Sequence, residues 1–319
     1  MRLVVSFCGL RPLENDQMLT IFTTGKPFRG HSGMIQRTAL KSWTLLHPDV
    51  EVILFGDDEG AREISEEFSL RHEPHVERNE FGSKRLDYMV ERAQEIARYD
   101  LLCYINCDII LLSDFCLALE RVSAAHAHFL MVGRRWDIDI QEPIDFSAQD
   151  ATQRLRQLAL SQGVQRGPDT IDYFAFRRRL YRDLPALVIG RIWWDHFLVW
   201  KALQLHADVV DVSSCAVAIH QNHDYGYHGA GAAGVWNDEQ ARQNFKLAGG
   251  SRHLYTIADA THILEPTSER QNWMRLFAPY WRLLRPKVAP GWMFLLDVTR
   301  PARRFLGLRR TRLPRATNR

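Results

Sequence analysis

An apolar segment in the first third of the chain carries two polar side chains at its centre. Residues 101–112 have the sequence LLCYINCDIILL, so Asn106 and Asp108 are two positions apart. A continuous apolar run of this kind predicts a strand that is buried on both faces of a sheet. A carboxylate inside such a strand is costly unless it is paired or holds a metal ion. We therefore expect the strand to break open at Asp108, with Asn106 on the same side because side chains alternate.

Three later segments also concentrate groups that can do chemistry. They are residues 169–177, 190–196 and 220–228. The last of them holds three histidines, an aspartate and two tyrosines in nine residues, and its first residue, His220, directly follows an apolar run. A divalent ion such as Mn²⁺ accepts carboxylate and imidazole ligands together. Two interpretations stay open: metal-binding histidines, or histidines that only form hydrogen bonds in a polar loop.

The Asn-x-Asp pair resembles the DxD element of GT-A glycosyltransferases, especially the bacterial family-2-like ones. In that family the element holds a divalent ion and the diphosphate of a nucleotide sugar, and a histidine after a later strand completes the metal shell. The resemblance implies Asp108 and His220 as metal ligands, with His223 as the alternative histidine, and Mn²⁺ or Mg²⁺ as the ion. Asn106 departs from the family's first Asp. Because an amide is a weaker ligand, Asn106 contacts either the metal or the donor's ribose.

The same resemblance implies roles on the acceptor side. Asp195 is the candidate general base, which takes the proton of the acceptor hydroxyl in a transfer with inversion. Trp194 offers a flat apolar wall to a sugar ring, and Asp172 and Tyr173 are candidates for orienting acceptor hydroxyls. The alternative is that Asp195 is only a helix N-cap and the tryptophans belong to the core, in which case retention stays open.

The elements that must position these groups alternate between strand and helix. In the first half we expect strands at 3–8, 50–55 and 101–112 and helices at 32–46, 59–68 and 83–98. This order predicts an α/β fold with a doubly wound, mostly parallel sheet, in which ligands bind beyond the carboxyl ends of the strands. Arg11, Asp57 and Asp108 follow such ends, so we expect them to line one crevice. Lys84 begins the helix before the Asp108 strand and is expected near the donor.

The second half is less regular. We expect strands at 128–133, 170–176 and 209–219, helices at 151–162, 195–205 and 237–247, and a polar loop at 134–150. Ser32 is the expected N-cap of the first helix, and Asn237 with Gln240 forms the expected capping box of the last. The resemblance covers residues 1–265, with a nucleotide-sugar-binding half at 1–115 and an acceptor-binding half at 116–265. Residues 266–319 form a helical or irregular C-terminal arm.

Composition places limits on the class of protein. The chain has 319 residues, of which 46% are hydrophobic, which suits a globular α/β fold. It has no run of about 18 apolar residues, so no transmembrane helix is expected. Its five cysteines are not spaced as a zinc site, and its start has no signal-peptide cleavage region. These features predict a cytoplasmic protein with reduced thiols.

Charge is unevenly distributed along the chain. Residues 270–319 contain 13 Lys and Arg against one acid, whereas the rest of the chain contains 28 Lys and Arg against 37 Asp and Glu. Aromatic residues alternate with arginines in this basic arm. The pattern suits peripheral contact with an anionic inner membrane face, or an arm packed on the body. Single-stranded nucleic acid is the weakest of the three interpretations.

The expected function is a metal-dependent glycosyltransferase of the hexosyltransferase type, which moves a sugar from a nucleotide-diphosphate donor to a saccharide or lipid-linked acceptor. One alternative is a nucleotidyltransferase that makes nucleotide sugars, but residues 9–12 (GLRP) are poor in glycine for its phosphate loop. A second alternative is a non-catalytic carbohydrate- or membrane-binding module on the same fold. P-loop, dinucleotide-binding and nucleophile-elbow motifs are absent from the sequence.

Overall fold

The computed structural model describes residues 18–148, 150–223 and 235–277. The helices and strands are β1 Leu19–Thr24, α1 Gly30–Thr44, β2 Glu51–Phe55, α2 Ala61–Glu67, β3 Arg71–Glu73, α3 Leu86–Ile96, β4 Leu101–Ile105, β5 Ile109–Leu111, α4 Asp114–Ala125, β6 Phe129–Val132, β7 Arg135–Ile138, α5 Ala151–Gln162, β8 Val164–Gln165, β9 Tyr173–Arg177, α6 Trp194–Gln204, β10 Asp208–Asp211, β11 Ala218–Gln221, α8 Glu239–Leu247, η2 Gly250–His253, η3 Ile257–Asp259, β12 His262–Leu264, β13 Glu269–Gln271 and η4 Trp273–Phe277.

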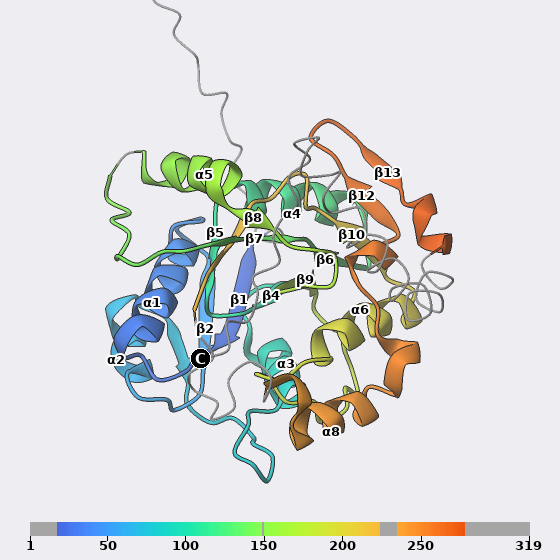
Figure 1. Ribbon diagram of the computed structural model, residues 1–319, viewed down its shortest axis with the longest axis horizontal. Helices are drawn as coiled ribbons and strands as arrows, with labels where there is room; N and C mark the ends of the chain where they lie inside the picture. Colours follow the sequence, from blue (N-terminus) through green and yellow to red (C-terminus); the bar gives the residue numbers. More distant parts are fainter. Residues whose placement is uncertain (1–17, 149, 224–234, 278–319) are drawn as a thin grey trace, which may run out of the picture. The chain divides into compact units, whose positions relative to one another are not determined.

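Among the described residues, nine strands form one large sheet in the order β13-β12-β10-β6-β9-β4-β1-β2-β3 (Figure 1). β9 and β13 run antiparallel to their neighbours, and the other strands share one direction. The chain passes from β1 through β2 to the β3 edge, then returns through α3 to β4 on the other side of β1. The winding therefore reverses between β1 and β4, where an open sheet binds its ligands. The predicted α/β fold with a doubly wound, mostly parallel sheet is confirmed.

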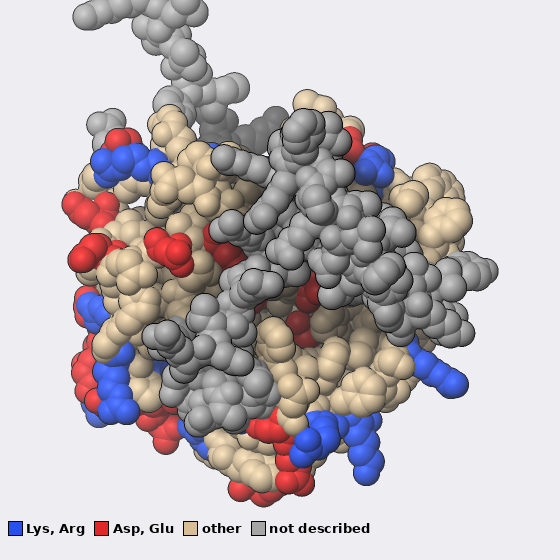
Figure 2. Space-filling model, viewed as in Figure 1, with Lys and Arg blue, Asp and Glu red and all other residues tan. Residues whose placement is uncertain are grey.

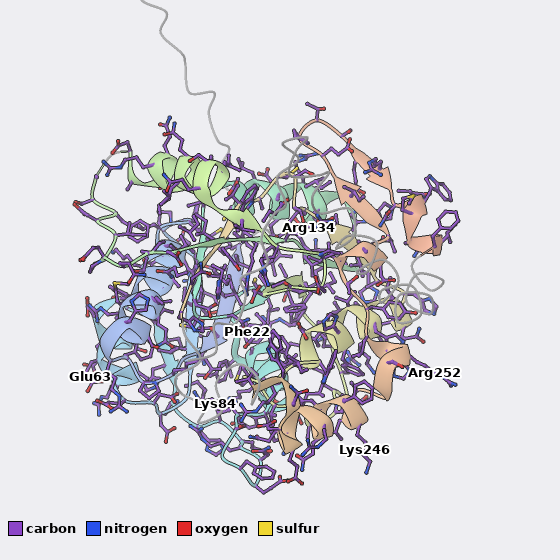
Figure 3. All side chains as sticks on the ribbon, viewed as in Figure 1. Phe22, Glu63, Lys84, Arg134, Lys246 and Arg252 are labelled. Carbon is purple, nitrogen blue, oxygen red and sulfur yellow. The ribbon has the colours of Figure 1, made fainter. Side chains whose placement is uncertain are left out.

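Helices cover both faces of this sheet because its central strands are apolar on both sides. In β4, Leu102 and Tyr104 pack in one core with α3 and α6, and Cys103 and Ile105 pack in another with α1, α2 and α4. This is the alternation expected of a fully buried strand. Phe22 of β1 is fully buried and lies in the middle of the packed side chains (Figure 3).

A smaller sheet carries part of the site. Its order is β5-β11-β7-β8, with β5 antiparallel and β7 parallel to β11. The register places His220 of β11 beside Ile109 on one side and beside Asp137 on the other. Since Asp108 directly precedes Ile109, the three strands bring Asp108, His220 and Asp137 together.

Helix α1 anchors the turn that contains Asp108. The indole N–H of Trp43 donates to the Ile109 carbonyl at 2.9 Å, and the amide N–H of Gln221 donates to the carbonyls of Ile35 at 2.9 Å and Asp108 at 3.3 Å. Trp43 and Gln221 are fully buried. Truncating a buried tryptophan to alanine costs about 3–5 kcal/mol, so this turn is held by the core of the domain.

Two strand predictions differ from the structure, and the strand expected at 3–8 lies outside the described residues. The sequence analysis did not predict β1. The expected loop at 134–150 contains β7, and the single strand expected at 209–219 is two strands that belong to different sheets. Between those two strands, the carboxylate of Asp211 accepts hydrogen bonds from the backbone N–H and the hydroxyl of Ser213. Such an Asx turn ends β10.

Two helix starts were also predicted wrongly. α1 begins at Gly30 with Arg29 as its N-cap, so Ser32 lies within its first turn. The N-cap of α8 is Asp238, whose carboxylate accepts from the backbone N–H of Ala241 at 2.8 Å. Asp238 serves here because it directly precedes the helix, and the side chain of Gln240 instead accepts from Asn79 at 3.0 Å.

The chain divides into two compact units, residues 1–271 and 272–319. The predicted boundaries at 115 and 265 remain predictions. In the described part of the second unit, η4 exposes four apolar side chains: Trp273 (69%), Met274 (69%), Leu276 (57%) and Phe277 (62%). Across the described residues, no helix combines the length and apolarity needed to cross a membrane. On the face in Figure 2, basic and acidic side chains of the described residues are interspersed.

Candidate active site

A cavity of about 790 Å³ opens where the winding of the large sheet reverses. Thr24 and Gly25 at the end of β1 and residues 106–108 after β4 line it, together with the first turn of α6 and side chains from β7 and β11. Its volume is within the range of about 300–1,000 Å³ that is usual for ligand sites. The cavity therefore lies at the carboxyl ends of β1 and β4, where the sheet topology predicts a ligand site.

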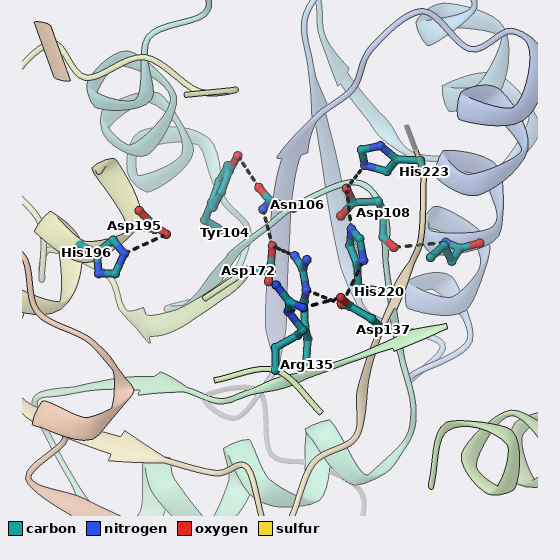
Figure 4. Close-up of polar contacts among 12 residues, drawn as sticks. Tyr104, Asn106, Asp108, Arg135, Asp137, Asp172, Asp195, His196, His220 and His223 are labelled. Atoms are coloured by element: carbon teal, nitrogen blue, oxygen red, sulfur yellow. Dashed lines mark hydrogen bonds and ion pairs between the residues drawn. The ribbon is translucent and has the colours of Figure 1, made fainter. Parts of the chain in front are cut away.

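Asp108 lies in the break between β4 and β5, as predicted. Its Oδ2 is 3.1 Å from Nε2 of His223 and 3.7 Å from Nε2 of His220 (Figure 4). Its Oδ1 is buried and has no hydrogen-bond partner among the described residues. One carboxylate thus faces two imidazoles with one of its oxygens still available.

Asp137 supports His220 from the side opposite Asp108. Its Oδ1 is 3.2 Å from Nδ1 of His220. This is an ion-pair distance, and Nδ1 of His220 makes no hydrogen bond of good geometry among the described residues. The Asp137 carboxylate therefore acts on the imidazole through its charge, while Nε2 faces Asp108. The order Asp137–His220–Asp108 is thus the carboxylate–histidine arrangement that supports metal ligands in proteins.

Charge keeps both carboxylates ionised. Burial acts to raise the pKa of Asp108, but the two histidines and Arg135 outweigh it and hold that pKa well below its ordinary value. Burial also opposes ionisation of Asp137, where the neighbouring His220 and the charge of Arg135 lower the pKa. Both groups are therefore anionic at neutral pH.

The residues present fit a divalent cation. Ligand atoms of Asp108, His220 and His223 all lie within 4.8 Å of one another. The available Oδ1 of Asp108 and the supported Nε2 of His220 are the chemical features that a metal ligand set requires. One carboxylate with two imidazoles suits Mn²⁺ better than Mg²⁺, because Mg²⁺ prefers oxygen ligands alone.

Asn106 belongs to a different network. Its side-chain N–H donates to Oδ1 of Asp172 at 2.9 Å, and its backbone N–H donates to the Asp172 carbonyl at 2.9 Å. Arg135 donates to the same Oδ1 at 2.8 Å. An aspartate at position 106 would place a second carboxylate against Asp172, so the contact explains why the amide fits here.

Arg135 and Asp137 are functional candidates that the sequence analysis missed. Arg135 donates to Asp137 at 2.8 Å and to Asp172 at 2.8 Å, so it links the two networks. Burial acts to lower the pKa of Arg135, but Asp172 and Asp137 raise it well above its ordinary value, so the side chain stays cationic. The available signal was the alternation of charged and apolar residues over 135–138, which is typical of a strand with one buried face.

Asp195 lies in the first turn of α6 and lines the same cavity. Its Oδ1 is buried without a hydrogen-bond partner among the described residues, and its Oδ2 is 3.9 Å from Nε2 of His196. Burial raises the pKa of Asp195, against an opposing effect of His196. In Figure 4, Asp195 and Asp108 lie on opposite sides of Asn106 and Asp172.

The tryptophans before Asp195 differ in their surroundings. Trp194 is 5% exposed and packs against Tyr104 and Phe174 at centroid distances of 5.3 and 5.5 Å. Trp193 has a left-handed backbone with φ 90°, which is unusual for a bulky residue. Trp193 and Trp236 both line the cavity, and Trp236 is 53% exposed. Trp236, which the sequence analysis missed, therefore offers more ring surface to a ligand than Trp194 does.

The predicted donor residues have different environments. Lys84 lines the cavity but is buried in an ion pair with Asp58, and its ammonium donates to the Gly25 carbonyl at 2.7 Å (Figure 3). Burial lowers the pKa of Lys84, although Asp58 opposes this effect. Asp57 is 71% exposed, pairs with Arg78 at 2.8 Å and does not line the cavity. Arg11 lies outside the described residues.

The structure places two predicted acceptor residues differently. Asp172 lines the cavity, whereas Tyr173 is fully buried against Phe115 at a centroid distance of 5.5 Å and does not line it. The reason is the alternation of side chains, which turns neighbouring residues toward opposite faces of the sheet. Contact between Tyr173 and an acceptor would require this core to open.

No protein-family model and no curated protein matches the sequence. Among solved structures, TarS residues 1–349 from S. aureus in complex with UDP-GlcNAc matches at a TM-score of 0.46 and 11% identity, over 72% of this chain and 65% of that chain. Glucosyl-3-phosphoglycerate synthase from Mycobacterium tuberculosis, in complex with Mn²⁺, UDP-glucose and phosphoglyceric acid, matches at 0.42 and 15%, over 73% and 80%.

Both of these solved structures contain a nucleotide sugar. This chain spans 65% of the TarS chain.

Proposed function

We propose that this chain is a glycosyltransferase that moves a sugar from a nucleotide-diphosphate donor to an acceptor hydroxyl. The observation that carries the proposal is that one cavity contains two separate chemical features. Asp108, His220 and His223 form a ligand set for a divalent ion, and Asp195 is a separate carboxylate with a raised pKa. A transfer of this kind needs both a site for the charged leaving group and a base for the acceptor.

The donor's diphosphate would bind beside Asp108. A divalent ion, when bound there, supplies Lewis-acid neutralisation of the charge on the leaving nucleoside diphosphate. Asp137 lies 3.2 Å from Nδ1 of His220, and Arg135 fixes Asp137 and Asp172 in place. We propose Mn²⁺ as the ion because two of the three ligands are imidazoles.

Asp195 would act on the acceptor. As the acceptor oxygen attacks the anomeric carbon, the bond from that carbon to the diphosphate oxygen breaks, and Asp195 takes the hydroxyl proton. Burial raises the pKa of Asp195, which makes its carboxylate a stronger base than an exposed one. We propose inversion at the anomeric carbon, since this route requires only one displacement.

We propose a saccharide or lipid-linked acceptor, met by a cytoplasmic enzyme at an anionic membrane face. The support comes from η4, where four apolar side chains are more than half exposed, and from the basic sequence that follows. Apolar side chains next to many arginines match an anionic bilayer interface. Co-sedimentation should recover the wild type with vesicles containing phosphatidylserine and less of the Trp273→Ala/Phe277→Ala variant. Equal recovery of both proteins would contradict this role of η4.

The experiment that tests the activity is a donor screen. Purified full-length protein is incubated with UDP- and GDP-sugars and Mn²⁺, and the released nucleotide is measured with the wild type and with Asp195→Asn. Slow release of nucleoside diphosphate by the wild type, with water as acceptor, supports the transferase. Release of pyrophosphate from a nucleoside triphosphate and a sugar phosphate would instead identify the nucleotidyltransferase.

A further inference from the structure

A second group of histidines and carboxylates lies outside the cavity. His126 follows the last residue of α4, and its Nδ1 is 2.9 Å from Oδ2 of Asp208. Nδ1 of His262 is 3.7 Å from the other oxygen of Asp208, and the two imidazole rings are 4.9 Å apart. On its far side, Nε2 of His126 is 2.8 Å from Oε1 of Glu269. None of these residues lines the cavity described above.

The strand register explains why these residues meet. Val210 of β10 is paired with His262 of β12, and Leu264 of β12 is paired with Glu269 of β13. Because side chains alternate, Asp208, His262 and Glu269 project on the face that carries Val210 and Leu264. Val210 and Leu264 pack in the same core as α4, so His126 at the end of α4 lies over the three strands.

The distances suit a tetrahedral ion. Zinc-bound nitrogen and oxygen at about 2.0–2.1 Å from the metal lie about 3.3 Å from each other in a tetrahedron. The two imidazole–carboxylate separations are 2.9 Å to Oδ2 and 3.7 Å to Oδ1 of Asp208, so they fall on either side of that value, each at a different oxygen. The ligand atoms of His126, Asp208 and His262 all lie within 4.8 Å of one another.

Glu269 completes the arrangement. It accepts the Nε2 hydrogen of His126 and leaves the Nδ1 lone pair facing Asp208. This is the outer carboxylate that commonly supports a zinc-bound histidine. Two carboxylates also balance the charge of a divalent ion, and the carboxyl end of α4 favours positive charge. The Thr261 hydroxyl, 2.9 Å from His262 Nδ1, can turn its hydrogen to the Val209 carbonyl when that nitrogen binds a metal.

We propose that His126, Asp208 and His262 bind a structural zinc ion, with Glu269 as the outer ligand support and water at the open position. Asp208 is 44% exposed, so the ion can enter from solvent and retain a water. The ion links the end of α4 to β10 and β12, and through Glu269 to β13. It binds the folded chain and therefore stabilises this edge of the large sheet.

The test uses full-length protein in which Asp108→Asn and His223→Gln remove ligands of the cavity site. After treatment with a chelator, this protein is titrated with Zn²⁺ by calorimetry and melted with and without the metal. We expect one equivalent of zinc to bind and the melting temperature to rise by about 2–4 °C. Adding His262→Gln should abolish both effects, and adding Glu269→Gln should weaken binding about 10–100-fold.

His206→Asn is the matched control, because His206 is exposed, lies two residues before Asp208 and takes no part in the cluster. It should bind zinc as the parent does. Absence of zinc binding from the folded parent would overturn the proposal. So would binding that His262→Gln leaves unchanged.

Discussion

Two places in this molecule present two imidazoles to one carboxylate, and they differ in what surrounds them. At Asp108 the two separations are 3.1 and 3.7 Å, and at Asp208 they are 2.9 and 3.7 Å. Asp108 lines a cavity of about 790 Å³, whereas Asp208 does not line it. We therefore propose different purposes for these similar ligand sets: an ion at Asp108 would meet a substrate in the cavity, and an ion at Asp208 would link the end of α4 to the sheet.

The position along the strands explains this difference. Asp108 follows the carboxyl end of β4, beside the reversal of winding, where the diverging loops leave space for a ligand. Asp208 and His262 are the first residues of β10 and β12, and the end of α4 covers their face of the sheet.

Asp195→Asn should separate chemistry from binding. Removal of a general base costs about 10²–10⁴-fold in rate, so transfer should fall by that factor. Binding of Mn²⁺ and nucleotide should persist, because Asp195 is not among the proposed ligands. Transfer rates with a responsive acceptor and calorimetry on the same preparation measure the two effects. Unchanged transfer by Asp195→Asn would exclude the residue as the base.

Asp137→Asn should weaken metal binding without removing a ligand. The carboxylate supports His220 at 3.2 Å, and loss of such support costs about 10–100-fold in metal affinity. Titration of Mn²⁺ measures this change. Asp145→Asn is the control, because Asp145 is exposed and its carboxylate accepts hydrogen bonds from the backbone N–H and the hydroxyl of Ser147, away from His220. Equal losses in both variants would contradict the role of Asp137.

Asn106→Asp should destabilise the fold by about 1–3 kcal/mol at neutral pH, because the new carboxylate faces Asp172. Repulsion raises the pKa of the pair in the folded state, so the folded chain binds more protons than the unfolded one. The lost stability should therefore return as the pH falls through the raised folded-state pKa. Denaturation by urea at several pH values measures this. Asn106→Ala adds no charge, so its free energy of unfolding should not recover in this way at low pH. If neither variant gains stability as the pH falls, the contact between position 106 and Asp172 is contradicted.

The pH dependence of transfer should report Asp195. The base must be ionised, and burial raises its pKa above the ordinary 3.8, so activity should fall on acidification at a higher pH than an exposed aspartate would give. Single-turnover rates measured at several pH values locate this fall in activity. Metal–nucleotide binding, measured over the same range, separates it from protonation of the histidines. If the transfer rate and metal–nucleotide binding fall over the same pH range, protonation of Asp195 does not cause the loss of activity.

The sequence predicted the parts of the site that combine polar groups with apolar strands. Asn106, Asp108 and the histidines at 220 and 223 stand out because a charged or polar group beside a buried strand is costly. Arg135 and Asp137 did not stand out, because their strand has one polar face and lies in a segment rich in charge. β1 was missed for a related reason, since three threonines interrupt its apolar residues.

Contacts between distant segments could not be predicted from the sequence alone. The bond from Asn106 to Asp172 and the partners of Arg135 depend on the antiparallel insertion of β9 and on the separate small sheet. No local pattern in the chain specifies either feature. The same is true of the second cluster, whose four residues come from the end of α4 and from the first positions of three strands.

The central claim is that Asp108 and its histidines form a metal-dependent nucleotide site. Its most direct test is calorimetric titration of UDP and GDP, with and without Mn²⁺, on the wild type and on Asp108→Asn. The account predicts binding of one of these nucleotides by the wild type that requires Mn²⁺, and loss of that binding in the variant. Failure of the folded wild type to bind either nucleotide with Mn²⁺, or equal binding by Asp108→Asn, would contradict it.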